Sequence, residues 1–123
     1  KFYPTLFQNV IPKKFEIRVF YLNGCFFANA IFSQNDDMTR IDFRNYNHIN
    51  PNRTPPINLP NEIKKRIKTL MKKMQLNSGS IDMIYNTNGE YVFLEVNPVG
   101  QFWQVSYPCN YYLEREIAKA LSI

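Results

Sequence analysis

Apolar and polar side chains alternate along residues 80–97, on both sides of the dipeptide Asn88-Gly89. Two β-prone runs joined by Asn-Gly are the strongest short-range signal for a β-hairpin, and a two-residue turn fixes the register of the whole ladder. The expected opposite pairs are Thr87 with Glu90, Ile84 with Phe93, Asp82 with Glu95 and Ser80 with Asn97. Because successive side chains point to opposite faces of a strand, one face is wholly apolar and should form core. That face carries Ile81, Met83, Tyr85, Val92, Leu94 and Val96.

The other face of this hairpin gathers three oxygen-bearing side chains at its far end, Asp82, Glu95 and Asn97. Two carboxylates directly opposite each other in a ladder repel, and a cation between them reverses the sign of that interaction. Mg²⁺ prefers oxygen ligands and takes few of them from protein, so the three residues are candidate magnesium ligands. From the spacing alone, a hairpin edge whose charges point into water is an equal alternative.

A second hairpin is predicted for residues 15–33, with its turn at Asn23-Gly24. Its register places Arg18 opposite Asn29 on a partly polar face that also carries Glu16. The further pairs are Leu22 with Cys25, Phe20 with Phe27 and Glu16 with Ile31. The apolar face carries Phe15, Ile17, Val19, Tyr21, Phe26, Ala28, Ala30 and Phe32. Two hairpins of this kind predict an antiparallel sheet covered on one side.

Helical periodicity appears twice. Residues 58–75 carry an apolar stripe with basic residues on the opposite face, and a second helix is expected from Ser106 or Pro108 to about Leu121. The inward residues are Ile63, Ile67, Leu70, Met71 and Met74 in the first helix and Leu113, Ile117, Ala120 and Leu121 in the second. Residues 34–58 read as a long loop, and residues 98–104 as an aromatic loop. The order predicts one α+β domain over residues 1–123, a mainly antiparallel sheet with helices on one face.

The amino-acid composition narrows the functional class of the protein only slightly. The net charge of +5 favours an anionic partner without choosing between phosphates, an acidic peptide and nucleic acid. Nucleic acid is disfavoured, because the densest basic run lies on the wet face of a predicted helix. Cys25 and Cys109 are read as reduced thiols, and no signal peptide or membrane-spanning run is seen, so we expect a cytoplasmic protein.

Several segments match motifs of a known enzyme superfamily. Gly-Ser-Ile-Asp at 79–82, followed across an Asn-Gly turn by Glu-Val-Asn-Pro at 95–98, resembles the metal-binding end of ATP-grasp ligases. Segments 42–46, 94–102 and 108–114 resemble more closely the grasp-with-spasm peptide maturases, ATP-grasp enzymes of the graspetide (microviridin-type) synthetase group. The resemblance covers almost the whole chain but only the C-terminal part of such an enzyme. It therefore implies a C-terminal ATP-grasp subdomain, without the N-terminal and central nucleotide-binding parts.

The resemblance also implies cofactors and site residues. ATP and Mg²⁺ are the expected cofactors, with Asp82, Glu95 and Asn97 holding the metal. Arg44, in the Asp-Phe-Arg motif, would hold the γ-phosphate or the acyl phosphate, with Arg18 assisting. Arg40 is a second, weaker candidate for the same role. The nucleotide-binding residues implied are Gln8, Asn9, Val10 and Ile11 along the adenine edge and Leu94 against the ring. His48, the only histidine, is read as a loop residue without a catalytic role.

The implied activity is ATP-dependent peptide modification. The intact enzyme would activate side-chain carboxylates of a ribosomal precursor peptide as acyl phosphates and form ω-ester or ω-amide crosslinks. Its partners would be that peptide and the missing N-terminal part of the same enzyme, and a homodimer is left open. The isolated chain is expected to fold without catalysing turnover.

Two alternatives are retained. The first is an ATP-grasp ligase that adds amino acids, such as glutamate, to a protein or small molecule. Related glutamate ligases often carry a basic residue where this chain has Ser33-Gln34, which argues against simple glutamate addition. The second is a non-catalytic module that binds a peptide or nucleic acid, and the intact set Asp82, Glu95 and Asn97 speaks against it.

Overall fold

The computed structural model describes residues 12–32, 54–99, 102–109 and 111–122. Residues 1–11 and most of the predicted long loop lie outside the described residues. The same holds for the residues Gln8, Asn9, Val10, Ile11, Arg40 and Arg44, to which the resemblance assigns a role, and for His48.

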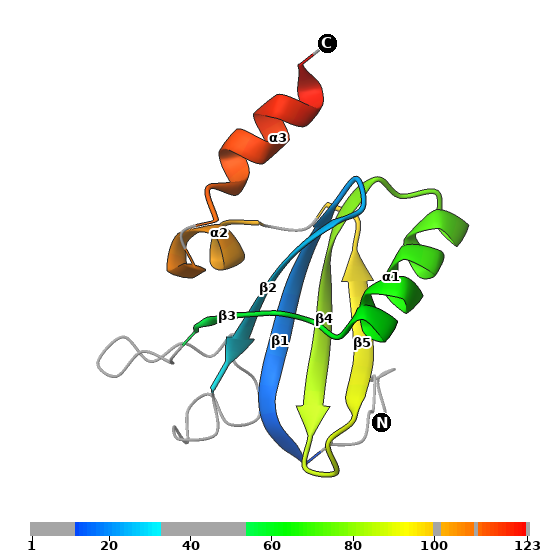
Figure 1. The fold of residues 1–123 in the computed structure, drawn as a ribbon, viewed down its shortest axis with the longest axis vertical. Coiled ribbons are helices and arrows are strands. Elements are labelled where there is room, and N and C mark those ends of the chain that lie inside the picture. Colours follow the sequence, from blue (N-terminus) through cyan, green and yellow to red (C-terminus); the bar gives the residue numbers. More distant parts are fainter. Residues whose placement is uncertain (1–11, 33–53, 100–101, 110, 123) are drawn as a thin grey trace, which may run out of the picture.

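A five-stranded sheet forms the centre of the described chain, with every neighbouring pair antiparallel and the strand order β3-β2-β1-β4-β5 (Figure 1). The strands are β1 (Lys13–Leu22), β2 (Cys25–Ile31), β3 (Pro56–Ile57), β4 (Ser78–Asn86) and β5 (Tyr91–Asn97). The helices are α1 (Asn61–Lys73), α2 (Trp103–Cys109) and α3 (Leu113–Leu121). The predicted α+β class with a mainly antiparallel sheet is confirmed. No helix of the described residues has the length and apolar character needed to cross a membrane.

The β1–β2 hairpin has the predicted turn and the predicted register. Asn23 and Gly24 both have positive φ, 48° and 87°, as a two-residue hairpin turn of this kind requires. Arg18 lies opposite Asn29, and the pairs on either side follow the expected count.

The β4–β5 hairpin differs from the prediction in two places that compensate each other. The backbone N–H of Asn86 donates to the Glu90 carbonyl over 2.9 Å, which closes a loop of three residues, 87–89. The Asn86 side chain accepts hydrogen bonds from the backbone N–H groups of Asn88 (3.0 Å) and Glu90 (2.8 Å). The pairing next to the loop is therefore shifted by one residue, and Ile84 faces Val92 instead of Phe93.

Leu94 then restores the expected register. It is the extra residue of a β-bulge between the pairs Met83–Phe93 and Asp82–Glu95, so Asp82 faces Glu95 as predicted. The expectation that Leu94 faces the core was wrong, since the bulge leaves this side chain 37% exposed.

Helix α1 covers the predicted apolar face of the sheet. Its buried residues Ile67 and Met71 belong to one core cluster with Ile17, Val19 and Ile81. The helix begins after Pro60 and ends at Lys73, so it is shorter than predicted. Met74, expected in the inward stripe, follows the last helical turn and is 42% exposed.

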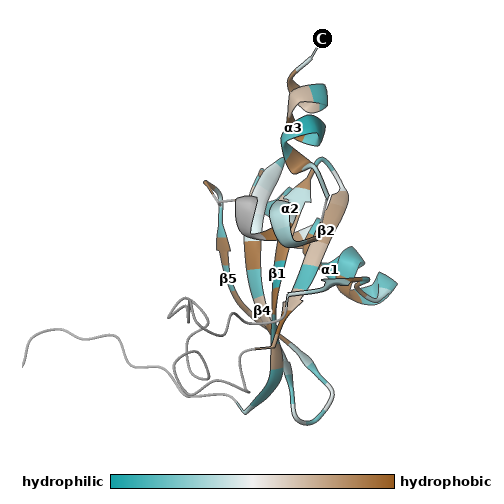
Figure 2. Ribbon diagram, turned by 90° about the vertical axis from the view of Figure 1, so that its left-hand side faces the viewer, coloured by the Kyte–Doolittle hydropathy of each residue, from teal (hydrophilic) through white to brown (hydrophobic). Residues whose placement is uncertain are grey.

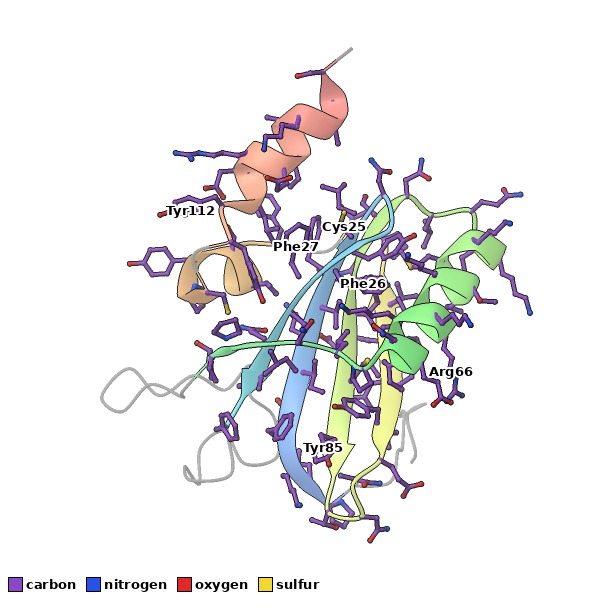
Figure 3. The ribbon with its side chains drawn as sticks, viewed as in Figure 1. Cys25, Phe26, Phe27, Arg66, Tyr85 and Tyr112 are labelled. Atoms are coloured by element: carbon purple, nitrogen blue, oxygen red, sulfur yellow. The ribbon has the colours of Figure 1, made fainter. Side chains whose placement is uncertain are left out.

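The C-terminal segment forms two short helices instead of one and packs on the other face of the sheet. Val105 and Leu113 contact Phe20 in a second cluster, and Phe20 points away from the face that α1 covers because its neighbours Val19 and Tyr21 point toward it. In the same way Phe26 packs in the α1 cluster and Phe27 in the α2 cluster (Figure 3). The expectation of helices on one face thus holds for α1 alone.

Tyr112 separates α2 from α3. Its backbone is left-handed, with φ 53° and ψ 46°, and cannot continue a right-handed helix. Helix α3 extends away from the sheet (Figure 1), and of the residues expected to face inward Ala120 is exposed and Leu121 is 78% exposed. The aromatic loop predicted for residues 98–104 is also shorter, because α2 begins at Trp103.

Candidate functional site

A row of polar residues crosses four strands on the face opposite α1. The Cα partners are Asn29 on β2, Arg18 on β1, Asp82 on β4 and Glu95 on β5. Directly opposite residues in neighbouring strands point to the same side of a sheet, so the four side chains share one face. Asn97 on β5 lies opposite Ser80, on the same face at the strand end. The structure therefore brings together Asp82, Glu95, Asn97 and Arg18.

Arg18 and Asp82 form a bidentate ion pair in the middle of this row. The guanidinium donates from Nε to Oδ1 of Asp82 over 2.8 Å and from Nη2 to Oδ2 over 3.0 Å. Both side chains are largely buried, with 12% and 15% of their area exposed. This pair supplies a cation next to the two facing carboxylates, so their proximity is explained without a bound metal.

Glu95 and Asn97 lie at the open edge of the row, and both are exposed. The Oδ1 atom of Asn97 accepts a hydrogen bond from the backbone N–H of Val99 over 3.1 Å, which orients the amide where the chain leaves β5. Glu95 presents its carboxylate outward from an edge strand. These are the positions from which oxygen atoms can reach a ligand in solution.

The donor set fits a magnesium ion of the kind that keeps much of its shell as water and phosphate. Two carboxylates and one amide are hard oxygen donors, and Mg²⁺ is usually held by one or two carboxylates together with substrate phosphates. Within the described residues no cluster of three or more His, Cys, Asp and Glu side chains could form an all-protein cage. A site here would thus depend on a phosphate ligand to complete it.

Glu16 lies two residues before Arg18 on β1, so the two side chains share one face of the sheet. Glu16 is buried on β1 and forms an ion pair with Lys13, three residues earlier on the same strand. The Arg18 guanidinium donates to Asp82, which lies on a strand 64 residues further along the chain. Arg18 therefore belongs to the polar row.

Aromatic side chains on either side of α2 border the row. Phe102 belongs to the predicted aromatic loop, whereas the packing of Tyr111 on β2 was not predicted. The ring centroids of Phe20 and Phe102 are 5.9 Å apart, and those of Phe27 and Tyr111 are 5.5 Å apart with the rings nearly perpendicular. The Tyr111 hydroxyl donates to the backbone carbonyl of Ala28 over 2.8 Å. Burial raises the pKa of Tyr111 above its ordinary value. Apolar residues at Phe20, Leu22 and Phe27 on the otherwise polar face were the available signal.

Comparison with known proteins finds similar solved structures but no matching family model or curated protein. No protein-family model matches the chain, and no curated protein matches it. Solved structures do match it, among them three proteins that are at least 30% identical in sequence.

The macrocyclase MdnC from Microcystis aeruginosa MRC, whose structure contains its precursor peptide MdnA, is 36% identical over 90% of this chain, with a TM-score of 0.71. A ligase from Chryseobacterium gregarium of the ATP-grasp type, associated with ribosomally synthesised and modified peptides and bound to ADP and a leader and core peptide, is 30% identical over 93%, with a TM-score of 0.76. The macrocyclase MdnB from Microcystis aeruginosa MRC is 31% identical over 94%, with a TM-score of 0.71.

This chain spans only 31%, 33% and 40% of the length of those three proteins. Within that span both the fold and the sequence agree, so the predicted resemblance to ATP-grasp peptide maturases is confirmed.

Proposed function

We propose that this chain is the C-terminal subdomain of an ATP-dependent ligase that forms ω-ester or ω-amide crosslinks in a ribosomally made precursor peptide. The observation that carries the proposal is the similarity, at 36% and 30% identity over nine tenths of the chain, to a macrocyclase and an ATP-grasp ligase whose structures contain peptides. The polar row adds a chemical reason, because it places oxygen donors and a guanidinium on one open face.

The reaction requires activation of a carboxylate, which does not react with alcohols in water. In the proposed sequence a carboxylate oxygen of the peptide attacks the γ-phosphorus of ATP, and ADP leaves. A hydroxyl or amine of the peptide then attacks the acyl carbon, and phosphate leaves with the former carboxylate oxygen. Such chemistry depends on positioning and charge neutralisation, which is what a rigid sheet face can supply.

The metal ligands proposed are Asp82, Glu95 and Asn97. Mg²⁺ bound there would neutralise negative charge on phosphate oxygens. Glu95 and Asn97 are exposed and can reach it directly, whereas Asp82 is held in one orientation by Arg18. We expect Glu95 to be the main protein ligand of the metal, with Asp82 contributing a second carboxylate from the neighbouring strand β4.

The remaining assignments concern phosphate and adenine. Arg44 is proposed to stabilise the transferring phosphoryl group, because its planar guanidinium matches phosphate oxygens, and Arg18 is proposed to assist. Leu94, which the bulge leaves partly exposed beside Glu95, is proposed to pack against adenine. The backbone of Gln8, Asn9, Val10 and Ile11 is proposed to bind the adenine edge. Catalysis is expected only from the intact enzyme, since this chain spans about a third of its relatives.

The test is to express the intact enzyme together with the precursor peptide encoded beside its gene and to weigh the peptide. Each crosslink removes one water, so the mass should fall in steps of one water. The Glu95→Gln variant should leave the mass unchanged, while Glu90→Gln, at the opposite end of the same hairpin, should behave as the wild type. An unchanged peptide mass with the wild-type enzyme, while ATP is still hydrolysed, would contradict crosslinking and favour the amino-acid ligase.

A further inference from the structure

The positive charge of this chain is concentrated on helix α1. The helix carries six of the fifteen lysine and arginine residues and one of the ten acidic residues, so the rest of the chain has nine of each sign. The net charge of +5 is therefore carried by a helix of 13 residues. The basic residues are Lys64, Lys65, Arg66, Lys68, Lys72 and Lys73.

Four lysines form a continuous stripe along one side of α1, which we call the lysine stripe: Lys64, Lys65, Lys68 and Lys72. Residues three and four apart lie next to each other on a helix. Of the two buried residues of α1, Ile67 and Met71, Met71 lies three residues after Lys68 and borders the stripe, and Lys64 is half-buried. Lys65, Lys68 and Lys72 are exposed, and the outer turns of α1 are hydrophilic (Figure 2).

Contacts with the body of the protein hold part of the stripe in place. The Nζ atom of Lys64 donates to the Asn58 side chain over 3.3 Å, and the Nζ atom of Lys68 lies 5.9 Å from the centre of the Phe26 ring. Lys64, Lys65 and Lys68 also line an open pocket together with Asn61 and Glu62. The stripe is thus an ordered surface.

The stripe is unfavourable for the isolated helix. Lys68 has a lysine four residues before it and another four residues after it, and like charges at this spacing repel. The one acidic residue, Glu62, lies in the first turn, where it interacts favourably with the helix dipole. An anionic partner lying along α1 would turn the repulsion among the lysines into attraction.

We propose that the lysine stripe binds acidic residues of the precursor peptide, on the face of the sheet opposite the polar row. The identity of the peptide rests on the proposed function, which requires a substrate that carries side-chain carboxylates. Each crosslink converts one carboxylate into a neutral ester or amide with loss of one water, the oxygen being carried away by the phosphate of ATP. The unreacted peptide is therefore more acidic than the product and binds the stripe more tightly, so binding weakens as crosslinking proceeds.

A peptide fits this surface better than nucleic acid does. The helix is about 20 Å long, the span of about six extended residues. Surfaces that bind single-stranded nucleic acid combine positive charge with aromatic side chains on which bases stack, and the sequence of α1 contains no aromatic residue.

Fluorescence anisotropy can test this with two labelled peptides, one rich in glutamate and one with every glutamate replaced by glutamine. The protein is this chain, as wild type, as Lys65→Gln/Lys72→Gln, and as the control Arg115→Gln/Lys119→Gln. The control removes the same charge from exposed positions of α3. Glutamine keeps the helix propensity of lysine.

The wild type and the α3 control should bind the glutamate peptide alike, with affinity that falls as salt is raised, and should not bind the glutamine peptide. The α1 variant should bind the glutamate peptide about three- to tenfold more weakly. Equal binding by all three proteins would overturn the proposal, as would tighter binding of a labelled oligonucleotide that depends on Lys65 and Lys72. Because binding needs no ATP, failure here is distinct from failure of the crosslinking assay.

Discussion

Arg18 and Asp82 face each other across β1 and β4, and the guanidinium donates to both carboxylate oxygens, over 2.8 and 3.0 Å. Glu95 stands directly opposite Asp82 on the next strand. The arginine therefore neutralises one of two neighbouring acids and leaves the other, which is exposed, as the residue with free access to a ligand. Within this row the ion pair stabilises the sheet, and Glu95 is the carboxylate that a ligand reaches most easily.

Removing the arginine should expose how much this pair stabilises the sheet. We expect Arg18→Gln to lower the free energy of unfolding by about 2 kcal/mol, because a largely buried carboxylate loses two charge-assisted hydrogen bonds. Urea unfolding of Arg18→Gln, Asp82→Asn and the double variant measures the coupling, which should be about 1–2 kcal/mol. Strict additivity of the two single changes would show that the pair is energetically neutral.

Glu95→Gln should affect ligand binding and leave folding unchanged. The Glu95 side chain is exposed and faces the acid Asp82, so the free energy of unfolding of the variant should stay within about 0.5 kcal/mol of the wild type. In thermal unfolding, Mg²⁺ with ADP should raise the melting temperature of the intact wild-type enzyme and of the Glu90→Gln control. The same shift in Glu95→Gln would argue against a magnesium ligand at this position.

Tyr111 should anchor the α2–α3 segment to β2. Tyr111→Phe removes the hydrogen bond to the Ala28 carbonyl and should cost about 1 kcal/mol in the free energy of unfolding. Tyr112→Phe is the matched control, since Tyr112 is 51% exposed and its ring, over which Arg115 lies, is retained. Equal stability of the two variants would mean that the Tyr111 hydroxyl contributes nothing.

The two cysteines should differ in reactivity. Burial raises the pKa of the Cys109 thiol to about 11, and this thiol lies 3.6 Å from the Thr54 carbonyl, whereas Cys25 is exposed. The thiolate is the reactive form, so at neutral pH iodoacetamide should alkylate Cys25 well before Cys109. Peptide mapping by mass spectrometry should show modification of Cys109 increasing only as the pH approaches 11. Rapid labelling of both thiols at neutral pH would contradict this packing.

The sequence predicted local features better than long-range contacts. The Asn23-Gly24 turn and its register were correct, because the turn depends on the positive φ of these two residues, which Asn and Gly adopt readily. The pairing of Asp82 with Glu95 was correct although the loop was one residue too short in the prediction, because the bulge at Leu94 offsets the error. An alternating pattern contains no signal for such a bulge.

Other features depend on contacts that no local pattern encodes. The Arg18–Asp82 pair requires β1 to lie beside β4, although the two residues are 64 positions apart in sequence. The break between α2 and α3 depends on a left-handed Tyr112, an uncommon conformation for this residue type, and helical periodicity does not reveal it. The packing of Val105 and Leu113 on Phe20 follows from that break.

The central proposal is that peptide carboxylates are activated by phosphoryl transfer from ATP. The most direct measurement follows the oxygen atoms, using a precursor peptide whose side-chain carboxylates carry heavy oxygen and the intact enzyme. Mass analysis of the inorganic phosphate should find one heavy oxygen atom for each crosslink formed. Crosslinked peptide accompanied by unlabelled phosphate would contradict an acyl phosphate and the function proposed for this chain.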